Sequence, residues 1–277
     1  MSKLLVSIVT PSFNQGDFID DCIQSIKNQT YDNIEHIIID ACSTDNTKEI
    51  LDKHKGTYNL KFLIEPDSGP ANAINKGFNL AKGDLFCWLN SDDYYLHKEV
   101  IQTVINYFEK YKTIDLVTGC GYKVDSSGKW IEPIINRHEK ITKNRIRYED
   151  SMLQPSTFWK KEVHVHLNEK LKYVFDWILF LQFFKNGANV LSVYDYLSAY
   201  RIHDLSRTYI DNSDRKKEIA NVLKVNFGAF SIQYFWGFYM YLLYKLSDVT
   251  SFGIFKRFAI LSNMMMNKIS VGRIVSY

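Results

Sequence analysis

The first hundred residues alternate between short apolar runs and amphipathic segments, with polar loops between them. Each apolar run is rich in β-branched residues and predicts a buried strand, whereas the amphipathic segments repeat apolar residues at helical spacing. Strands and helices that alternate in this way predict an α/β fold with a mostly parallel, Rossmann-like sheet flanked by helices. The predicted strands are residues 4–10, 34–40, 60–65 and 85–89, and the predicted helices are residues 17–29, a segment capped by residues 43–45 that ends near 55, and residues 70–81.

Beyond residue 97 the pattern is less regular. Two apolar stretches around the turn at 125–128 predict a β-hairpin, which is followed by another strand, a long apolar helix and a last strand. No proline follows Pro155, so the end of the chain is free to be helical. We place a domain boundary near residue 210, where the chain is charged and loop-like. The predicted elements are strands 115–123, 129–133, 154–159 and 189–193 and a helix over residues 171–185.

Polar side chains stand at or just after the end of each of the first four predicted strands. In an open α/β sheet, ligands bind beyond the carboxyl ends of the parallel strands. We therefore expect these side chains to converge on one edge of the sheet. They are Ser12 and Asn14 after the first strand, Asp40 at the end of the second, Asp67 after the third, and Asp92 and Asp93 after the fourth.

Asp92 and Asp93 are adjacent carboxylates at a predicted strand end. Two such groups repel each other unless a cation or a hydrogen-bond donor lies between them. Oxygen ligands of this kind suit Mg²⁺ or Mn²⁺ that is shared with a diphosphate. The alternative is a solvated turn that caps the helix predicted to start near His97. The other strand-end acids favour the interpretation as a divalent-cation site.

Two further acids in this half follow strands. Asp40 comes directly after three isoleucines, and at a sheet edge its carboxylate can accept the N3–H of a uracil or thymine ring. Asp67, within the loop of residues 65–69, can hydrogen-bond the same ligand. The alternatives are an ordinary acid at a strand-to-loop junction for Asp40 and a loop cap for Asp67.

A single acid, Asp176, stands within the apolar segment 173–180. An unpaired carboxylate in a protein core costs free energy, so Asp176 should face a cavity or have a partner. A general base beside an acceptor hydroxyl meets this condition. The alternative is a cap at the N-terminus of the predicted helix.

Three histidines in the second half are candidate ligands. His203 follows Arg201 with one residue between them, and the family resemblance given below implies that such a segment contacts a metal or a diphosphate, with Arg201 as an anion partner. The alternative for His203 is a surface histidine or a satisfied core histidine. His164 and His166 alternate as in an exposed strand, and because no third ligand is in sight we assign them no metal.

The composition of the 277-residue chain limits its class. Hydrophobic residues make up 46% and charged residues 23%, which is ordinary for a soluble globular protein. The net charge of +3 and the lack of a basic, aromatic-rich stripe before residue 200 argue against a nucleic-acid partner. The four cysteines form no CxxC pair and indicate free thiols in a reducing compartment. The first apolar run is too short for a signal peptide, so we expect a cytoplasmic protein.

Four segments within roughly residues 3–97 resemble a known family when they are taken together: VSIVTPSFNQ, IIIDACSTDNT, EPDSGPANAINKG and GDLFCWLNSDD. In this order they are similar to the nucleotide-sugar-binding half of glycosyltransferase family 2, which has the GT-A fold. The resemblance implies a metal-dependent, inverting enzyme that uses a nucleoside-diphosphate sugar, a UDP-sugar more than a dTDP-sugar. The acceptor it implies is a hydroxyl of a glycan or a lipid-linked glycan, in surface polysaccharide synthesis.

The resemblance also assigns roles to parts of the chain. Residues 1–97 become the nucleotide-sugar-binding half, residues 98–210 the acceptor-binding half, and residues 211–277 a helical extension. Asp176 becomes the catalytic base. The implied donor site consists of Pro11, Ser12, Asn14, Asp40, Asp67, Asn75, Asp92 and Arg201, and the implied ligands of a Mn²⁺ or Mg²⁺ cofactor are Asp92, Asp93 and His203.

The C-terminal extension has its own pattern. Residues 225–244 contain no charged side chain and are rich in tyrosine, phenylalanine and tryptophan, which favour a membrane–water boundary. From Lys245 onward the chain contains five basic residues and a single acid, Asp248. Three interpretations stay open: helices on a membrane surface, a packing or homodimer helix pair, and a true span. The first would place the protein at the inner face of the cell membrane.

Two other functions also use an α/β sheet with carboxylates. A nucleotidyltransferase usually begins with a glycine-rich, basic phosphate loop, and the first loop here, PSFNQG, has no nearby basic residue. A non-catalytic module that binds nucleotide sugars is the other alternative. A dinucleotide-dependent dehydrogenase is disfavoured because no GxGxxG motif follows the first strand.

Overall fold

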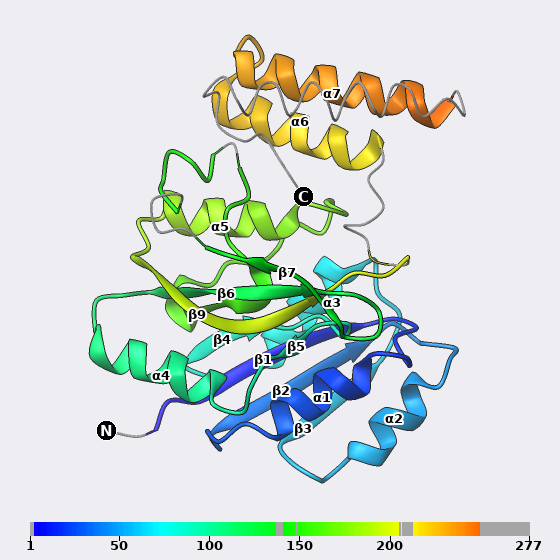
Figure 1. The fold of residues 1–277 in the computed structure, drawn as a ribbon, viewed down its shortest axis with the longest axis vertical. Coiled ribbons are helices and arrows are strands. Elements are labelled where there is room, and N and C mark those ends of the chain that lie inside the picture. The colour runs from blue at the N-terminus through cyan, green and yellow to red at the C-terminus, as the bar shows by residue number, and fades with distance from the viewer. Residues whose placement is uncertain (1–2, 137–140, 148, 205, 207–212, 250–277) are drawn as a thin grey trace.

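The structure, a computed structural model, describes residues 3–136, 141–147, 149–204, 206 and 213–249, and in these residues one sheet is flanked by helices (Figure 1). The strands are β1 (Val6–Ser12), β2 (Ile34–Asp40), β3 (Leu60–Ile64), β4 (Leu85–Trp88), β5 (Tyr94–Tyr95), β6 (Leu116–Val124), β7 (Trp130–Ile134), β8 (Thr157–Lys160) and β9 (Val190–Arg201). The helices are α1 (Ile19–Lys27), α2 (Thr47–His54), α3 (Pro70–Leu80), α4 (Val100–Lys110), α5 (Phe175–Lys185), α6 (Ser213–Phe227) and α7 (Ile232–Val249). The order across the sheet is β3-β2-β1-β4-β8-β6-β9-β5, with β7 paired to β6.

The N-terminal half forms the parallel part of the sheet. Strands β3, β2, β1 and β4 are neighbours and all run parallel, as the alternating pattern predicts. Every residue of β1 and β2 is buried, which fits their content of valine and isoleucine, and the burial extends to polar residues such as Glu35 and His36. Helix α3 packs closely on β1, since a Cβ added at Gly77 would lie 2.3 Å from a methyl group of Val9.

The second half completes the sheet with mixed directions. Strand β8 is antiparallel to β4 and β6, and β5 is antiparallel to β9, whereas β6 and β9 run parallel. The α/β class is therefore confirmed, with the parallel strands concentrated in the N-terminal half. Strand β9 continues to Arg201, well past its predicted end at Val193, and its register against β6 shifts near Cys120. This irregular strand has no strict alternation of apolar and polar residues, so the sequence pattern did not predict its full length.

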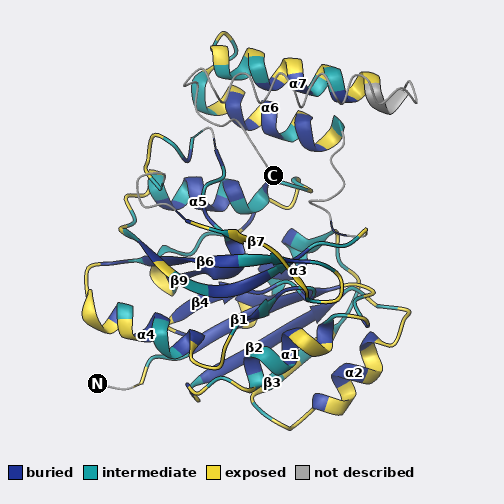
Figure 2. Ribbon diagram, in the orientation of Figure 1, coloured by how far each residue is buried: buried dark blue, intermediate teal, exposed yellow. Residues whose placement is uncertain are grey.

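The described part of the C-terminal extension is a helix pair that continues the main core. Ile219, Val222 and Leu223 of α6 belong to the same buried cluster as the sheet and α5. Figure 1 shows α6 lying over α5, with α7 outside α6, and Figure 2 shows buried residues along α6. In the part of the chain that the structure describes, no helix is long and apolar enough to cross a bilayer.

Candidate active site

The strand ends of the parallel half converge, as expected from the sequence. Ser12 of β1 lies beside Asp40 of β2 in the strand register. Ser91, in the loop after β4, donates its hydroxyl to the carbonyl of Pro11 at 3.0 Å. The hydroxyl oxygen of Ser12 is buried and has no hydrogen-bond partner within the described residues. A buried polar atom of this kind is a candidate contact for a ligand.

Asp40 is fully buried and is held by its own loop. One carboxylate oxygen accepts the backbone N–H of Ser43 at 2.8 Å and the other accepts its hydroxyl at 2.6 Å. Asn14 crosses over from the β1 loop, because its N–H bonds the Ser43 hydroxyl oxygen and its side-chain oxygen accepts the Thr44 N–H, both at 2.8 Å. Asn14 and Cys42 have φ angles of 51° and 59°, in the left-handed region that favours glycine or asparagine. The two loops therefore form one rigid unit.

Asp92 and His203 meet although 111 positions separate them in the sequence. The His203 Nε2 lies 3.1 Å from an Asp92 carboxylate oxygen, and the imidazole also packs against the ring of Phe18 at 4.5 Å between centroids. The Asp92 side chain is partly exposed, with 21% of its surface accessible, whereas that of His203 is nearly buried. The pair thus presents one oxygen ligand and one nitrogen ligand at the sheet edge.

Asp93 lies behind this pair and is buried. One of its oxygens accepts the backbone N–H of Arg201 at 2.9 Å and the other accepts the Asn90 amide at 3.1 Å. Burial, and then the charge of Asp92, raise the pKa of the Asp93 carboxyl well above its ordinary value. Both oxygens are thus engaged by the protein, so this geometry joins the end of β9 to the loop after β4.

The Arg201 guanidinium, an expected partner of the diphosphate, already has several protein contacts. It donates to an Asp21 carboxylate oxygen at 2.6 Å and lies over the rings of Phe18 and Tyr94 at 4.9 and 5.3 Å. Its side chain is 2% exposed, and its Nε has no hydrogen-bond partner within the described residues. The structure therefore anchors Arg201 between α1 and β9, and its backbone supports Asp93.

Two other expected donor residues have contacts that shape loops. Asp67 accepts the backbone N–H of Gly69 at 2.8 Å, which is the loop cap weighed from the sequence. The Asn75 amide donates to the Leu167 carbonyl at 3.0 Å and accepts the Leu167 N–H at 2.8 Å. It also donates to the Glu169 carboxylate at 2.8 Å. Asn75 thereby ties α3 to the segment that leads into α5.

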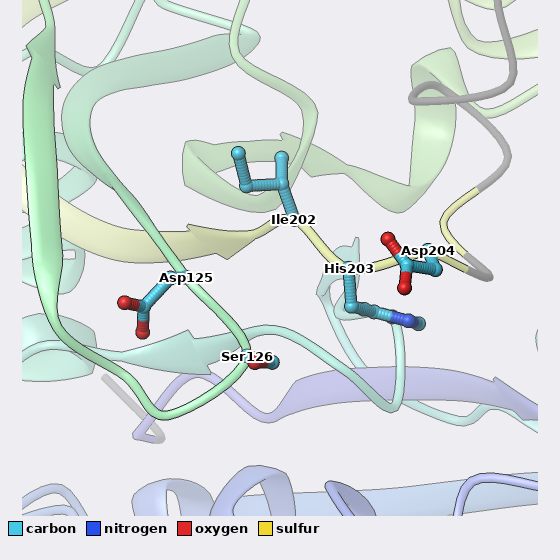
Figure 3. Close-up of a pocket in the computed structure, with 5 residues that line it drawn as sticks. All are labelled: Asp125, Ser126, Ile202, His203 and Asp204. Carbon is cyan, nitrogen blue, oxygen red and sulfur yellow. The ribbon is translucent and has the colours of Figure 1, made fainter.

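A small pocket lies beside His203, between the end of β9 and the turn of the β6–β7 hairpin. Its volume is about 240 Å³. Figure 3 shows the hairpin turn facing the strand end across this space. Since the Asp92 carboxylate touches the His203 ring, the pocket adjoins the acid–imidazole pair. The lining residues are Asp125, Ser126, Ile202, His203 and Asp204.

Asp176 lies in the first turn of α5 and is half-buried. One of its oxygens accepts the backbone N–H of Trp177 at 2.8 Å, so the carboxyl stays close to its own helix end. Burial raises the pKa of the Asp176 carboxyl to about 6, while that N–H and the charge of Arg215 act in the opposite direction. The carboxyl is therefore ionised at pH 7 and is basic enough to take up a proton.

The sequence analysis missed a second acid at this site, Asp150. Burial, and then the charge of Asp176, raise the pKa of Asp150 well above its ordinary value. One Asp150 oxygen is buried and has no hydrogen-bond partner in the described part of the chain. The only sequence signal was an acid pair, Glu149-Asp150, in an irregular segment. Nothing in that pattern shows that it folds against the start of α5.

His164 and His166 have structural contacts. The His164 ring packs against Phe78 at 4.5 Å between centroids, and its Nδ1 accepts the indole N–H of Trp159 at 3.3 Å. Burial lowers the pKa of His164 to about 4. His166 is paired with the side chain of Asn79 at 3.0 Å. Both rings therefore serve to pack the segment between β8 and α5 against α3.

The fold and the site together define an α/β protein of the GT-A type. The model of the family described as "Glycosyl transferase family 2" matches residues 7–164, more than half of the chain. The chain therefore belongs to glycosyl transferase family 2, a family of transferase enzymes. The resemblance of the four N-terminal segments and the GT-A-type fold expected from it are both confirmed.

Three similar proteins illustrate the relationship. An uncharacterized glycosyltransferase of Rickettsia typhi is 28% identical over 216 residues, which cover 74% of this chain and 66% of that protein. Chondroitin synthase of Pasteurella multocida is 31% identical over 188 residues, which cover 66% of this chain and 19% of that protein. The crystal structure of S. aureus TarS 1-349 in complex with UDP-GlcNAc has a TM-score of 0.67 at 20% identity, covering 90% of this chain and 75% of that chain. This chain thus spans two thirds or less of these curated relatives.

Proposed function

We propose that this protein is an inverting glycosyltransferase that moves a sugar from a nucleoside-diphosphate donor to a hydroxyl of a glycan or lipid-linked glycan. The observation that carries the proposal is the contact between Asp92 and His203 at 3.1 Å, on the sheet edge that also holds Asp40. A UDP-sugar is favoured over a dTDP-sugar, because TarS, which shares the fold, binds UDP-GlcNAc. Chondroitin synthase, a sequence relative, supports a role in polysaccharide synthesis.

The donor's nucleoside is assigned to the loops after β1 and β2. The Asp40 oxygens each accept one bond from Ser43, and a carboxylate oxygen can accept a second donor, such as an imide N–H. The unpartnered hydroxyl of Ser12 lies in register beside it. Pro11 and Asn14 belong to the same strand end and loop, whereas Asp67, Asn75 and Arg201 support the site through the loop and strand contacts described above.

The residues at the sheet edge fit a divalent cation. Asp92 offers a partly exposed carboxylate and His203 an imidazole, which are both ligands that Mn²⁺ accepts. Within the described residues no three acids, histidines or cysteines cluster as a complete metal site, so the donor's phosphates and water would supply the other ligands. Asp93 supports the site from behind through the backbone of Arg201. When bound, Mn²⁺ or Mg²⁺ would neutralise charge on the departing diphosphate.

The acceptor is assigned to the side of Asp176. In a single displacement, the acceptor hydroxyl attacks the anomeric carbon from the face opposite the diphosphate, which inverts the configuration. Asp176 takes the hydroxyl proton as the new glycosidic bond forms, and the nucleoside diphosphate leaves with the bonding electron pair. Its pKa of about 6 keeps Asp176 ionised at neutral pH, as a general base requires.

Product analysis tests this proposal against the two alternatives. The protein is incubated with Mn²⁺ and a panel of UDP-, dTDP- and GDP-sugars, with and without glycan acceptors. A glycosyltransferase releases the nucleoside diphosphate, a nucleotidyltransferase releases pyrophosphate, and a binding module releases neither. Asp92→Asn should lower release of the diphosphate by about 10²-fold or more, and Asp52→Asn, at an exposed acid on α2, is the matched control. Pyrophosphate as the product, or equal rates in both variants, would overturn the proposal.

The helix pair is assigned to peripheral contact with a membrane. Along α7, large apolar side chains are exposed at a spacing that places them on one face. Such a face beside basic residues suits the cytoplasmic surface of a membrane, where a lipid-linked acceptor is held. The basic residues Lys256, Arg257, Lys268 and Arg273 lie outside the described residues. A homodimer through the same face is the alternative. The exposed residues are Ile232, Phe235, Tyr239, Leu242 and Leu246.

A further inference from the structure

Helix α6 reaches from the C-terminal extension to the start of the helix that carries Asp176. The Glu218 carboxylate accepts the backbone N–H of Lys172 at 2.8 Å with one oxygen. With the other oxygen it accepts those of Tyr173 at 2.9 Å and Val174 at 3.3 Å. Helix α5 has no side-chain cap of its own at Val174. Glu218 therefore satisfies backbone donors that the sequence around α5 leaves open, and its negative charge suits a helix N-terminus.

A second set of contacts joins α6 to the segment that carries Asp150. The Asn226 amide donates to the Arg147 carbonyl at 3.1 Å, and the Arg147 guanidinium donates back to the Asn226 carbonyl at 2.5 Å. The neighbouring Ile146 carbonyl accepts the indole N–H of Trp177 at 2.6 Å. Trp177 follows Asp176 directly, so α6, the Asp150 segment and the first turn of α5 form one connected unit.

Arg215 supplies the positive charge in this unit. Its side chain is buried, and its charge acts on both Asp176 and Asp150, lowering their pKa values against the effect of burial. Glu149 adds negative charge beside Asp150, and it is itself paired with Arg145. One buried arginine thus offsets two neighbouring carboxyls.

We infer that Glu218 is a positioning residue for the base, because its carboxylate fixes the first turn of α5 through three backbone N–H groups. This inference rests on the proposed function of Asp176. By this inference, α6 contributes to the geometry of the acceptor site as well as to the hydrophobic core.

Replacement of Glu218 tests the orientation of the base. Glu218→Gln keeps the shape of the side chain but turns an amide NH₂ toward backbone donors, so the first turn of α5 should shift. A shift of about 1 Å should lower kcat about 10-fold to 10²-fold. The KM for the donor should stay the same, and Glu218→Asp should recover part of the rate. The matched control is Asp214→Asn, which removes an exposed acid from the same helix.

Two outcomes of this experiment are distinguishable. Hydrogen exchange of the amides of residues 172–178 should rise in Glu218→Gln and not in Asp214→Asn, and this readout needs no activity. A wild-type kcat in Glu218→Gln would overturn the inference and leave the proposed function intact. If the wild-type protein releases no nucleoside diphosphate with any donor, the proposed function itself fails.

Discussion

At the donor edge, Asp40 is held by Ser43, three residues further along the chain, whereas the first turn of α5 is held by Glu218, 44 to 46 residues away. The nucleoside loops are thus built from contacts within one loop and from contacts between the ends of two neighbouring strands, 29 and 30 positions apart in the chain. The base site depends on a helix that docks from the C-terminal extension. Damage to α6 should therefore affect acceptor chemistry while the donor loops keep their geometry. The predictions below test this separation, from the largest expected effect to the smallest.

Asp176→Asn should have the largest effect, since it removes the base and leaves the donor edge intact. We expect kcat to fall by about 10²-fold to 10⁴-fold, the usual contribution of a general base. Binding of UDP should be unchanged, because the hydrogen bonds described above for the loops after β1 and β2 join those loops to each other and not to α5. Steady-state kinetics measure kcat, and a thermal-shift titration with UDP measures binding at the donor edge. Weaker UDP binding would show that the two regions are coupled, and a near-wild-type kcat would remove Asp176 as the base.

His203→Ala should affect the donor edge instead. It removes the imidazole beside Asp92, so the Mn²⁺ concentration needed for half-maximal activity should rise about 10-fold to 100-fold. His166→Ala, which loses the hydrogen bond between its imidazole and the side-chain oxygen of Asn79, is the matched control and should leave the Mn²⁺ requirement unchanged. Activity measured over a Mn²⁺ titration gives this concentration for both variants. Equal requirements in the two variants would leave His203 without a metal role.

The pH dependence of the wild-type enzyme should follow the base site. Because burial raises the pKa of Asp176 to about 6, the carboxyl becomes protonated as the pH falls through this value. A protonated carboxyl cannot accept the hydroxyl proton, so kcat should fall about tenfold per pH unit below pH 6. The residual activity of Asp176→Asn should not show this limb. If it does, another group is responsible for the profile.

The donor half was predictable because its structure is local. Parallel strands buried on both faces are continuous apolar runs, and Ile34–Asp40 is both the predicted and the observed extent of β2. The assignment of Asp92 and His203 to one cation came from the family resemblance, because the last strand was predicted to end at Val193, ten residues before His203. Strand β8 was predicted three residues too early, because the polypeptide forms a 3₁₀ turn over Gln154–Ser156 before the strand begins at Thr157. Pro155, the second residue of that turn, has no backbone N–H to donate to a neighbouring strand, so it does not fit the interior of the predicted strand.

The contacts of single charged groups were not predictable. The sequence pattern places Arg201 near the donor, but its pairing with Asp21 depends on how α1 packs against β9. The roles of Asp150 and Glu218 depend on α6 docking over α5. Apolar periodicity predicts which face of α6 is buried, but it does not predict which other element packs against that face.

The exposed face of α7 should give the smallest effect on folding and thereby isolates the membrane proposal. Ile232→Ser and Phe235→Ser replace side chains that are 61% and 55% exposed, so unfolding free energies should change by no more than about 0.5 kcal/mol. Met240→Ser, on the buried face of the same helix, should instead cost about 2 kcal/mol or more. Truncation would be a poor test, since Ile219 and Leu223 belong to the main core. Sedimentation with vesicles that contain anionic lipid should show weaker binding for the two exposed-face variants. Unchanged sedimentation together with a concentration-dependent loss of dimer would assign the face to a second copy of the chain.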